Sequence, residues 1–269
     1  EPSLPWSGTR LAKTYSPQAM QATIPEAFGT PLGPSSEDCL YLNVWTPAKE
    51  ASADLDTQRS QNTAKELSKK HPVMVWIHGG ALRWGSGELN GLPLAQKGVV
   101  LVSMNYRHGL FGYFAHPELS TESPHQSSGN YAILDQIQAL KWVQENISAF
   151  GGDPDNVTVF GCSAGGSSIH ALVTSPLAKG LFHKAIAQSG SLYFPSRGLS
   201  TPLFGAESAE ALGLEFMQSA TAKDLAELCA MPAGRLIQIA DSADSGDFYK
   251  KSGNIVDGWV LPDQPLVIS

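Results

Sequence analysis

The chain has 269 residues, of which 42% are hydrophobic and 16% are charged. This apolar content can fill a core, so the composition excludes a disordered chain. The net charge is −7 and no basic cluster is present, which argues against nucleic acid as a partner because phosphates need grouped Lys and Arg. The longest apolar runs, 73–77 and 99–102, are far shorter than the ~18 residues of a membrane span. We therefore expect a soluble globular chain.

The first part of the chain carries few regular patterns. Residues 1–36 are rich in Pro and Gly and lack periodicity, which predicts an extended meander over the surface. Leu40–Trp45 then alternates, with Leu40, Leu42 and Val44 on one face, as is typical of a half-buried strand. Residues 48–70 are polar and poor in aromatic side chains, which predicts a mobile insertion.

Two short apolar runs and one long periodic segment follow. Val73–Ile77 and Val99–Ser103 are rich in β-branched residues and fit buried parallel strands, and a buried helix is the alternative that the pattern alone leaves open. Apolar residues at helical spacing predict a helix over Tyr131–Phe150, with Asn130 as its N-cap and Gly151 at its end.

The remaining elements alternate between strand and helix. We predict strands at Asn156–Phe160 and Lys184–Gln188, a helix at Ser167–Thr174, two or three helices within 206–240, and a loop over 242–253. Strands that alternate with helices predict an α/β fold with a mostly parallel sheet covered on both faces.

The stretch from Gly161 to Gly165 reads Gly-Cys-Ser-Ala-Gly and fits the pattern G-x-S-x-G. It lies between a predicted strand and a predicted helix, where a nucleophile elbow would hold Ser163 on a sharp, strained turn. Glycines two residues to either side avoid clashes, and the N-terminus of the next helix favours a developing negative charge. The alternative is an ordinary Gly-rich turn between a strand and a helix.

A second motif, His78-Gly79-Gly80-Ala81, directly follows the predicted strand at 73–77. It matches the HGGG-type loop whose backbone amides stabilise the oxyanion of acyl transfer, where small residues let the backbone approach the substrate. A tight turn after a strand is the simpler alternative for this motif alone. The two motifs together, in this order, favour an acyl-transfer site.

Further strings accompany these motifs: Ser36–Pro47, Trp76–Ala81, Asn105–Arg107, Gly129–Asn130 with Leu134–Gln136, Phe150–Thr158, Gly161–Gly166 and Asp257–Pro262. Together they resemble the type-B carboxylesterases, a family of α/β-hydrolases that includes cholinesterases and bacterial para-nitrobenzyl esterases. The resemblance covers nearly the whole chain apart from residues 48–70. It implies an α/β-hydrolase fold, a mostly parallel central sheet flanked by helices, as one incomplete domain over residues 1–269.

The resemblance also implies roles for individual residues. Ser163 would be the nucleophile that forms an acyl-enzyme with a small-molecule carboxylic ester, and Gly80, Ala81 and Ala164 would donate the oxyanion-hole amides. His78 would orient the oxyanion loop rather than act as the base. The family completes its triad with an acidic residue and then a histidine, far later in the chain than His183.

No histidine follows His183, so we expect the triad to be completed outside this chain. We expect a fragment that lacks the extreme N-terminus and the C-terminal half of an esterase, with that half as a partner. Two alternatives stay open: a catalytically silent binding relative of the same fold, and an inert fragment of an active protein.

The sequence predicts neither a metal site nor a cofactor. The three cysteines, Cys39, Cys162 and Cys229, form no disulfide or zinc pattern, which favours reduced, buried thiols. In the resemblance, Cys162 stands where the family often has Glu, and Cys39 has no cysteine upstream to pair with. His116 and His125 flank a polar loop and are expected to face solvent.

Overall fold

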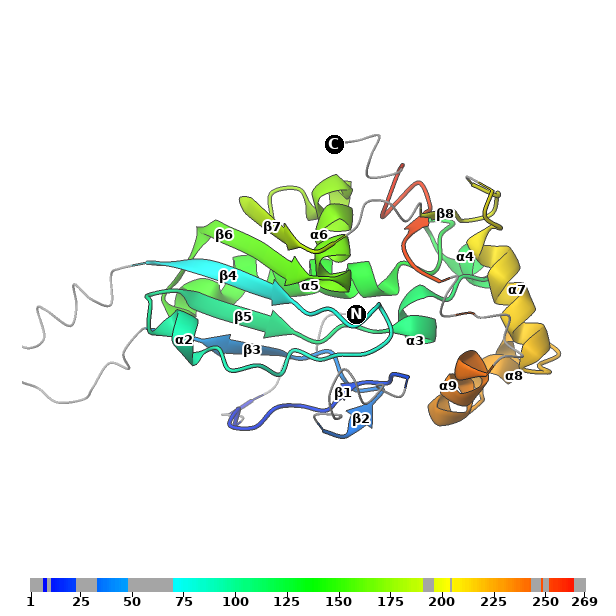
Figure 1. The fold of residues 1–269 in the computed structure, drawn as a ribbon, viewed down its shortest axis with the longest axis horizontal. Helices are drawn as coiled ribbons and strands as arrows, with labels where there is room; N and C mark the ends of the chain where they lie inside the picture. Colours follow the sequence, from blue (N-terminus) through cyan, green and yellow to red (C-terminus); the bar gives the residue numbers. More distant parts are fainter. Residues whose placement is uncertain are drawn as a thin grey trace, which may run out of the picture.

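A five-stranded sheet forms the centre of the molecule in a computed structural model, with helices packed against it and three more helices beyond one end (Figure 1). Two small two-stranded pairs lie outside this sheet. The residues that the structure describes are 7–8, 11–22, 33–47, 70–190, 196–203, 205–242, 248 and 252–263.

The central sheet has the strand order β3–β5–β4–β6–β7. Every neighbouring pair is parallel except β3 with β5, so the predicted mostly parallel sheet is confirmed. Because parallel strands end at the same edge of a sheet, the carboxyl ends of β4 and β6 lie side by side. The strands are β3 (Leu42–Trp45), β4 (His71–Ile77), β5 (Val100–Met104), β6 (Gly152–Cys162) and β7 (Lys184–Gln188).

The two apolar runs form the interior strands β4 and β5, as predicted. Val73, Val75 and Ile77 of β4 are fully buried, and so is every residue of β5. Burial of successive residues means that both faces of the sheet are covered here, which the continuous run of apolar side chains makes favourable.

The strand β7 is the opposite case. It forms one edge of the sheet, pairs with β6, and all five of its residues are exposed. The side chain of Ile186 is 43% exposed. Among the described strands, none covers the free edge of β7.

The helices α5 and α6 pack into the same core as the interior strands (Figure 1). The predicted helix after residue 130 is present, but its α-helical part ends at Asn146 and its last turn is a 3-10 helix that Gly151 caps at φ 75°. The helices and 3-10 turns in the order of the chain are α2 (Leu92–Ala95), α3 (Gly109–Tyr113), α4 (Pro117–Glu122), α5 (Tyr131–Asn146), η2 (Ile147–Phe150), α6 (Ala164–Thr174) and η3 (Pro176–Ala178).

Asn130 occupies the N-cap position of α5, as predicted, but it does not cap the helix through its side chain. Its side chain accepts no hydrogen bond from the first turn of α5. Its amide instead donates to the Ile255 carbonyl at 2.8 Å and accepts from the Ile255 amide at 3.0 Å. The Asn130 side chain therefore joins the start of α5 to Ile255, 125 residues later in the chain. It donates to and accepts from one backbone residue, as a neighbouring strand would.

Three helices form a second packed group beyond the carboxyl ends of the sheet strands (Figure 1). Phe216 and Phe248 are almost fully buried in this group, which also contacts α3 through Leu110 and Phe114. The prediction of two or three helices in this region is confirmed. The helices are α7 (Ala209–Ser219), α8 (Leu225–Cys229) and α9 (Ala233–Asp241).

The first 36 residues are described in part, and two short strands within them pair with each other. The pair joins β1 and β2 in parallel, and a similar pair joins β8 and β9. The predicted insertion at 48–70 lies outside the described residues except for Lys70, and most of the predicted loop at 242–253 does so too. The small strands are β1 (Gln18–Ala19), β2 (Ser35–Ser36), β8 (Arg197–Gly198) and β9 (Ile255–Val256).

Among the described helices, none combines the length and the apolar character that crossing a bilayer requires. The extent of the domain over residues 1–269 stays a prediction.

Candidate active site

Ser163 lies on the turn between β6 and α6, with φ 57° and ψ −122°. A side chain at positive φ strains the backbone by on the order of 1–3 kcal/mol, as at many functional sites. A Cβ at Gly161 would lie 2.6 Å from the Ile77 carbonyl oxygen, and one at Gly165 would collide with the same atom. The glycines of the motif are therefore required because the turn packs directly on the end of β4.

The backbone of Ser163 is held on both sides, while its side chain is open. Its amide donates to the Gln188 carbonyl at 2.8 Å, and its carbonyl accepts from the Ser167 amide at 3.0 Å. Ser163 is exposed, and its hydroxyl has no hydrogen-bond partner among the described residues. The turn thus presents a free hydroxyl at the carboxyl edge of the sheet.

The loop after β4, residues 78–85, has an unusual backbone, and we call it the glycine loop. Gly80 has φ 112°, and Ala81 and Leu82 follow at 54° and 63°. The Gly80 carbonyl accepts hydrogen bonds from the amides of Arg83 and Trp84, at 2.9 and 3.1 Å. A Cβ at Gly80 would collide with the Trp84 carbonyl oxygen, so only glycine fits this turn.

The loop and the serine turn are in direct contact. Ile77 pairs with Gly161 in the register of β4 and β6, which brings the residues after both strands together. A Cβ at Gly79 would lie 2.7 Å from the Cys162 carbonyl oxygen and 3.2 Å from the Ser163 Cβ. The amides of Gly80 and Ala81 donate no hydrogen bond within the described part of the chain. That these amides and the Ala164 amide converge on one point stays a prediction.

His78 lies behind the loop and is nearly buried. Its Nδ1 is 2.7 Å from the Gly79 carbonyl oxygen, and Tyr106 stacks on its ring and donates to the His78 carbonyl at 2.7 Å. Burial lowers the pKa of His78 to about 4, so the imidazole is neutral near pH 7. These contacts agree with an orienting role.

No histidine of the described residues, which include all seven of the chain, forms a hydrogen bond to Ser163. His125 is exposed, as expected, and stacks on Trp259. The expectation that His116 faces solvent is wrong: it is 2% exposed, its ring stacks on Phe114, and its Nδ1 accepts the Glu118 amide at the start of α4.

The three cysteines are free. Cys39 is buried, and burial raises the pKa of its thiol to about 11. Cys162, beside the serine, is half-buried, whereas Cys229 is exposed, so the expectation of buried thiols is wrong for Cys229. Among the described residues, no group of three or more His, Cys, Asp or Glu side chains could hold a metal ion.

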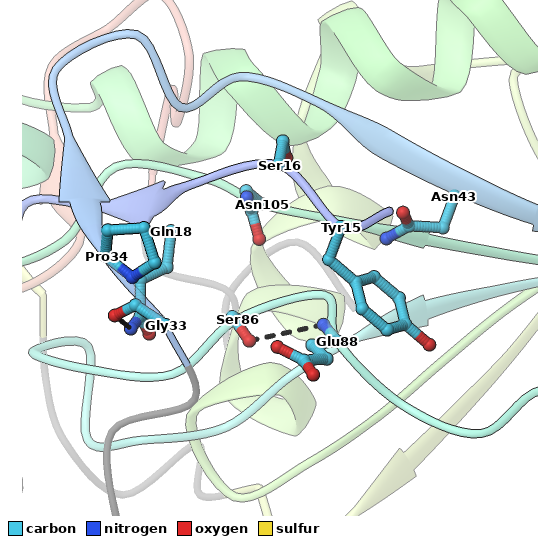
Figure 2. Close-up of a pocket in the computed structure, with 9 residues that line it drawn as sticks. All are labelled: Tyr15, Ser16, Gln18, Gly33, Pro34, Asn43, Ser86, Glu88 and Asn105. Atoms are coloured by element: carbon cyan, nitrogen blue, oxygen red, sulfur yellow. Dashed lines mark hydrogen bonds between the residues drawn. The ribbon is translucent and has the colours of Figure 1, made fainter. Parts of the chain in front are cut away.

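A polar cavity of about 190 Å³ lies between the N-terminal segment and the chain that continues from the glycine loop (Figure 2). Asn105 accepts the Gly87 amide at 2.8 Å, and Asn43 donates to the Gly87 carbonyl at 3.3 Å. Ser163 does not line this cavity. The amide side chains of Asn43 and Asn105 instead hold the backbone at Gly87, just after the loop. The lining residues are Tyr15, Ser16, Gln18, Gly33, Pro34, Asn43, Ser86, Glu88 and Asn105.

Sequence reasoning missed two residues that bind the loop. Gln21 and His108 both hydrogen-bond to the backbone of Gly85. Gln21 lies in a stretch without periodicity, where no local signal indicates a distant partner. His108 directly follows the string Asn105–Arg107, and its position after a buried strand was the one available signal.

A model of the carboxylesterase family matches residues 1–268. The chain belongs to the carboxylesterase family. Carboxylesterases of known structure share its fold: the carboxylesterase EST55 of Geobacillus stearothermophilus superimposes with a TM-score of 0.79 at 39% identity, over 100% of this chain and 50% of that one. A PNB esterase superimposes with a TM-score of 0.78 at 37% identity, over 98% of this chain and 51% of that one. The predicted α/β-hydrolase fold is therefore confirmed.

Carboxylesterases among the curated proteins show the same relationship in sequence. Fumonisin B1 esterase of Sphingopyxis macrogoltabida is 42% identical over 268 residues, which are 97% of this chain and 44% of that protein. Liver carboxylesterase 1F of Rattus norvegicus is 36% identical over 100% of this chain and 47% of its own length. The chain thus spans about half the length of the carboxylesterases that it matches.

Proposed function

We propose that the whole protein to which this chain belongs hydrolyses carboxylic esters through an acyl-enzyme on Ser163. The observation that carries the proposal is the place of Ser163: an exposed hydroxyl on a strained turn, with a glycine loop packed against it. Such a turn presents the nucleophile of α/β-hydrolases, and the loop supplies amides where charge develops.

The reaction follows from this arrangement. The Ser163 Oγ attacks the ester carbonyl carbon as its proton passes to a base, and the carbonyl oxygen becomes an oxyanion that accepts hydrogen bonds from the amides of Gly80, Ala81 and Ala164. The intermediate collapses to the acyl-enzyme and the alcohol takes the proton. Water then attacks the acyl carbon in the same way and releases the acid and Ser163.

We propose that the base and the acid of the triad come from a part of the protein outside these 269 residues. Two observations support this: no histidine of the chain bonds to Ser163, and both Ser163 and the neighbouring strand β7 are exposed. A serine hydroxyl without a base is a poor nucleophile. The chain by itself should therefore be nearly silent as a catalyst, and the missing half is its expected partner.

The proposed substrate class is a small-molecule carboxylic ester. The names of the relatives mention different compounds, fumonisin B1 in one and PNB in another, and esterase is the term that they share. The chemistry that the proposal takes from them is therefore cleavage of the ester bond, without a particular acid or alcohol.

The test compares three proteins with a nitrophenyl ester and a fluorophosphonate probe: the whole protein, its Ser163→Ala variant and the 269-residue chain. The whole protein should turn over the ester and label, and Ser163→Ala should lose about 10⁴-fold or more in kcat. The chain alone should stay close to the uncatalysed rate, since it keeps the oxyanion amides without a base.

Ser167→Ala is the matched control, because Ser167 lies one turn later in α6 and is also a serine. It should keep the activity of the parent. Turnover that survives in Ser163→Ala would refute the nucleophile, and brisk turnover by the chain alone, abolished by Ser163→Ala, would refute the absence of a base.

A further inference from the structure

The far end of the glycine loop is fastened at the Gly85 peptide. The Gln21 side chain accepts the Gly85 amide at 2.8 Å and approaches the Gly85 carbonyl at 3.4 Å. His108 Nε2 lies 3.2 Å from the same carbonyl. A Cβ at Gly85 would lie 2.7 Å from the Gly79 carbonyl oxygen and collide with His78, so the two ends of the loop meet at this glycine.

His108 makes this contact from a fully buried position. A carbonyl oxygen can only accept, so the proton of His108 sits on Nε2, and Nδ1 carries a lone pair. That Nδ1 is buried without a hydrogen-bond partner among the described residues. A buried acceptor without a partner costs free energy, because it has lost its hydrogen bonds to water. A leucine at 108 would avoid this cost, so the buried histidine has a purpose other than packing.

His78 mirrors His108 at the near end of the loop. Its Nδ1 donates to the Gly79 carbonyl, and its Nε2 is also buried without a partner in the described part. The rings of His78 and His108 meet edge to face at 5.1 Å, with Tyr106 against both. Burial lowers the pKa of both imidazoles, which keeps each of them neutral and its donor in place.

A shift at Gly85 would reach the amides that face the substrate. The Gly80 carbonyl binds the amides of Arg83 and Trp84, which makes residues 80–84 one closed turn that ends at Gly85. The loop is fixed in its middle by the Gly109 amide, which donates to the Leu82 carbonyl at 2.7 Å. Since Gly109 follows His108 directly, one short segment holds the loop at two places.

We propose that His108 is a positioning residue of the oxyanion loop, acting with Gln21 through the Gly85 peptide. This proposal rests on the proposed function of the loop. His108 touches no reacting atom: it holds the Gly80 and Ala81 amides where the oxyanion forms. A misplacement of about 1 Å can cost on the order of 10²-fold in rate.

The test uses the whole protein and compares His108→Leu with His108→Gln. Leucine keeps the bulk and removes the donor, so kcat should fall about 10–100-fold. KM should change less than about threefold, because the loop amides that His108 positions would act mainly on the oxyanion of the transition state. Glutamine can place an amide donor near the Nε2 position and should recover most of kcat. Tyr113→Phe is the control for packing, since its buried hydroxyl has no partner in the described part.

Gln21→Met removes the other side chain that hydrogen-bonds to Gly85. Because Gln21 is half-buried, this variant tests the proposal even if His108→Leu fails to fold. It should also lower kcat and leave KM nearly unchanged, and the double variant should lose less than the product of the two single losses. Equal losses in Leu and Gln at 108, or an unchanged kcat in both His108→Leu and Gln21→Met, would overturn the proposal. Activity that survives in Ser163→Ala would instead overturn the proposed function.

Discussion

The two sides of Ser163 are built in contrasting ways, and we call them the closed side, towards β4, and the open side, towards β7. On the side of β4, the glycine loop is hydrogen-bonded at its near end, middle and far end, and its support from His78 and His108 is buried. On the side of β7, the strand next to the serine is exposed along its whole length, and the serine hydroxyl is free.

This difference separates the two parts of the proposed chemistry. Stabilising an oxyanion requires donors that are fixed before the reaction, and the closed side provides a rigid backbone for them. Transferring a proton requires a base within hydrogen-bond reach, and the open side offers none among the described residues. In the proposed mechanism, the chain would therefore preform the electrostatic part of the site and leave proton transfer to residues that would cover the open side.

Gly80→Ala, which should disturb the rigid backbone of the closed side, is expected to have the largest effect on activity. A Cβ at this position collides with the Trp84 carbonyl, so the turn must open and move the neighbouring amides. We expect kcat of the whole protein to fall about 10²–10³-fold, as for loss of one oxyanion donor. Gly234→Ala is the control, because a Cβ there meets nothing within 4 Å. Unchanged steady-state kinetics in Gly80→Ala would remove the loop from catalysis.

The closed side should also make the chain sensitive to acid. The pKa of His78 is about 4 in the folded chain, against 6.5 ordinarily, because the buried ring resists a charge. Between pH 6.5 and about 4, His78 is protonated in the unfolded chain and neutral in the folded chain. The free energy of unfolding is therefore highest above about pH 6.5 and falls as the pH drops towards 4. The loss should be on the order of 3 kcal/mol for His78, and His108 adds to it in the same direction.

Urea unfolding of the chain at pH 7, 5.5 and 4.5 measures this loss. His108→Gln removes one of the two rings that face each other beside Tyr106, and it should make the dependence on pH shallower. His125→Gln, at an exposed histidine, is the control. Identical slopes in all three proteins would contradict the assignment of acid sensitivity to the closed side.

The contrast between the strands predicts a smaller effect. Val75 on β4 is fully buried, and Val75→Ala should destabilise the chain by about 2 kcal/mol through loss of buried methyl groups. Ile186→Ala on β7 should change the stability of the chain by less than about 0.5 kcal/mol. In the whole protein, the cost of Ile186→Ala should rise if β7 is covered there. Equal costs for both substitutions in the chain would show that β7 is already packed.

The smallest effect is expected for Cys162→Ser, next to the proposed nucleophile. Cys162 is the last residue of β6 and is half-buried, so its replacement should change kcat of the whole protein by no more than about twofold. A loss as large as that of Ser163→Ala would assign the covalent chemistry to the thiol instead.

Much of the fold was predictable because burial leaves a pattern along the chain. The apolar runs at 73–77 and 99–103 predicted β4 and β5, since strands buried on both faces need continuous apolar side chains. The turn at Ser163 was predictable as well, because its backbone packs so closely on β4 that only glycine fits at positions 161 and 165.

The supports that Gln21 and His108 give to the site were not predictable, because they are hydrogen bonds to Gly85 from residues far from it in the sequence. Gln21 reaches Gly85 across 64 positions, and Asn130 reaches Ile255 across 125. Such contacts depend on the finished fold and leave no periodic signal. The hydrogen bonds between the Asn130 side chain and Ile255 gave no signal for the same reason, although the N-cap position of Asn130 was predictable.

The pairing of Ile77 with Gly161 has a consequence for how the serine turn and the glycine loop come together during folding. The loop and the serine turn become neighbours only when β4 and β6 align, and such non-local parallel pairing is intrinsically slow because a long stretch of chain must close first. Local helices such as α5 can form earlier without creating any part of the site. In the whole protein, refolding followed by helix signal should therefore run ahead of refolding followed by labelling of Ser163 with a fluorophosphonate probe.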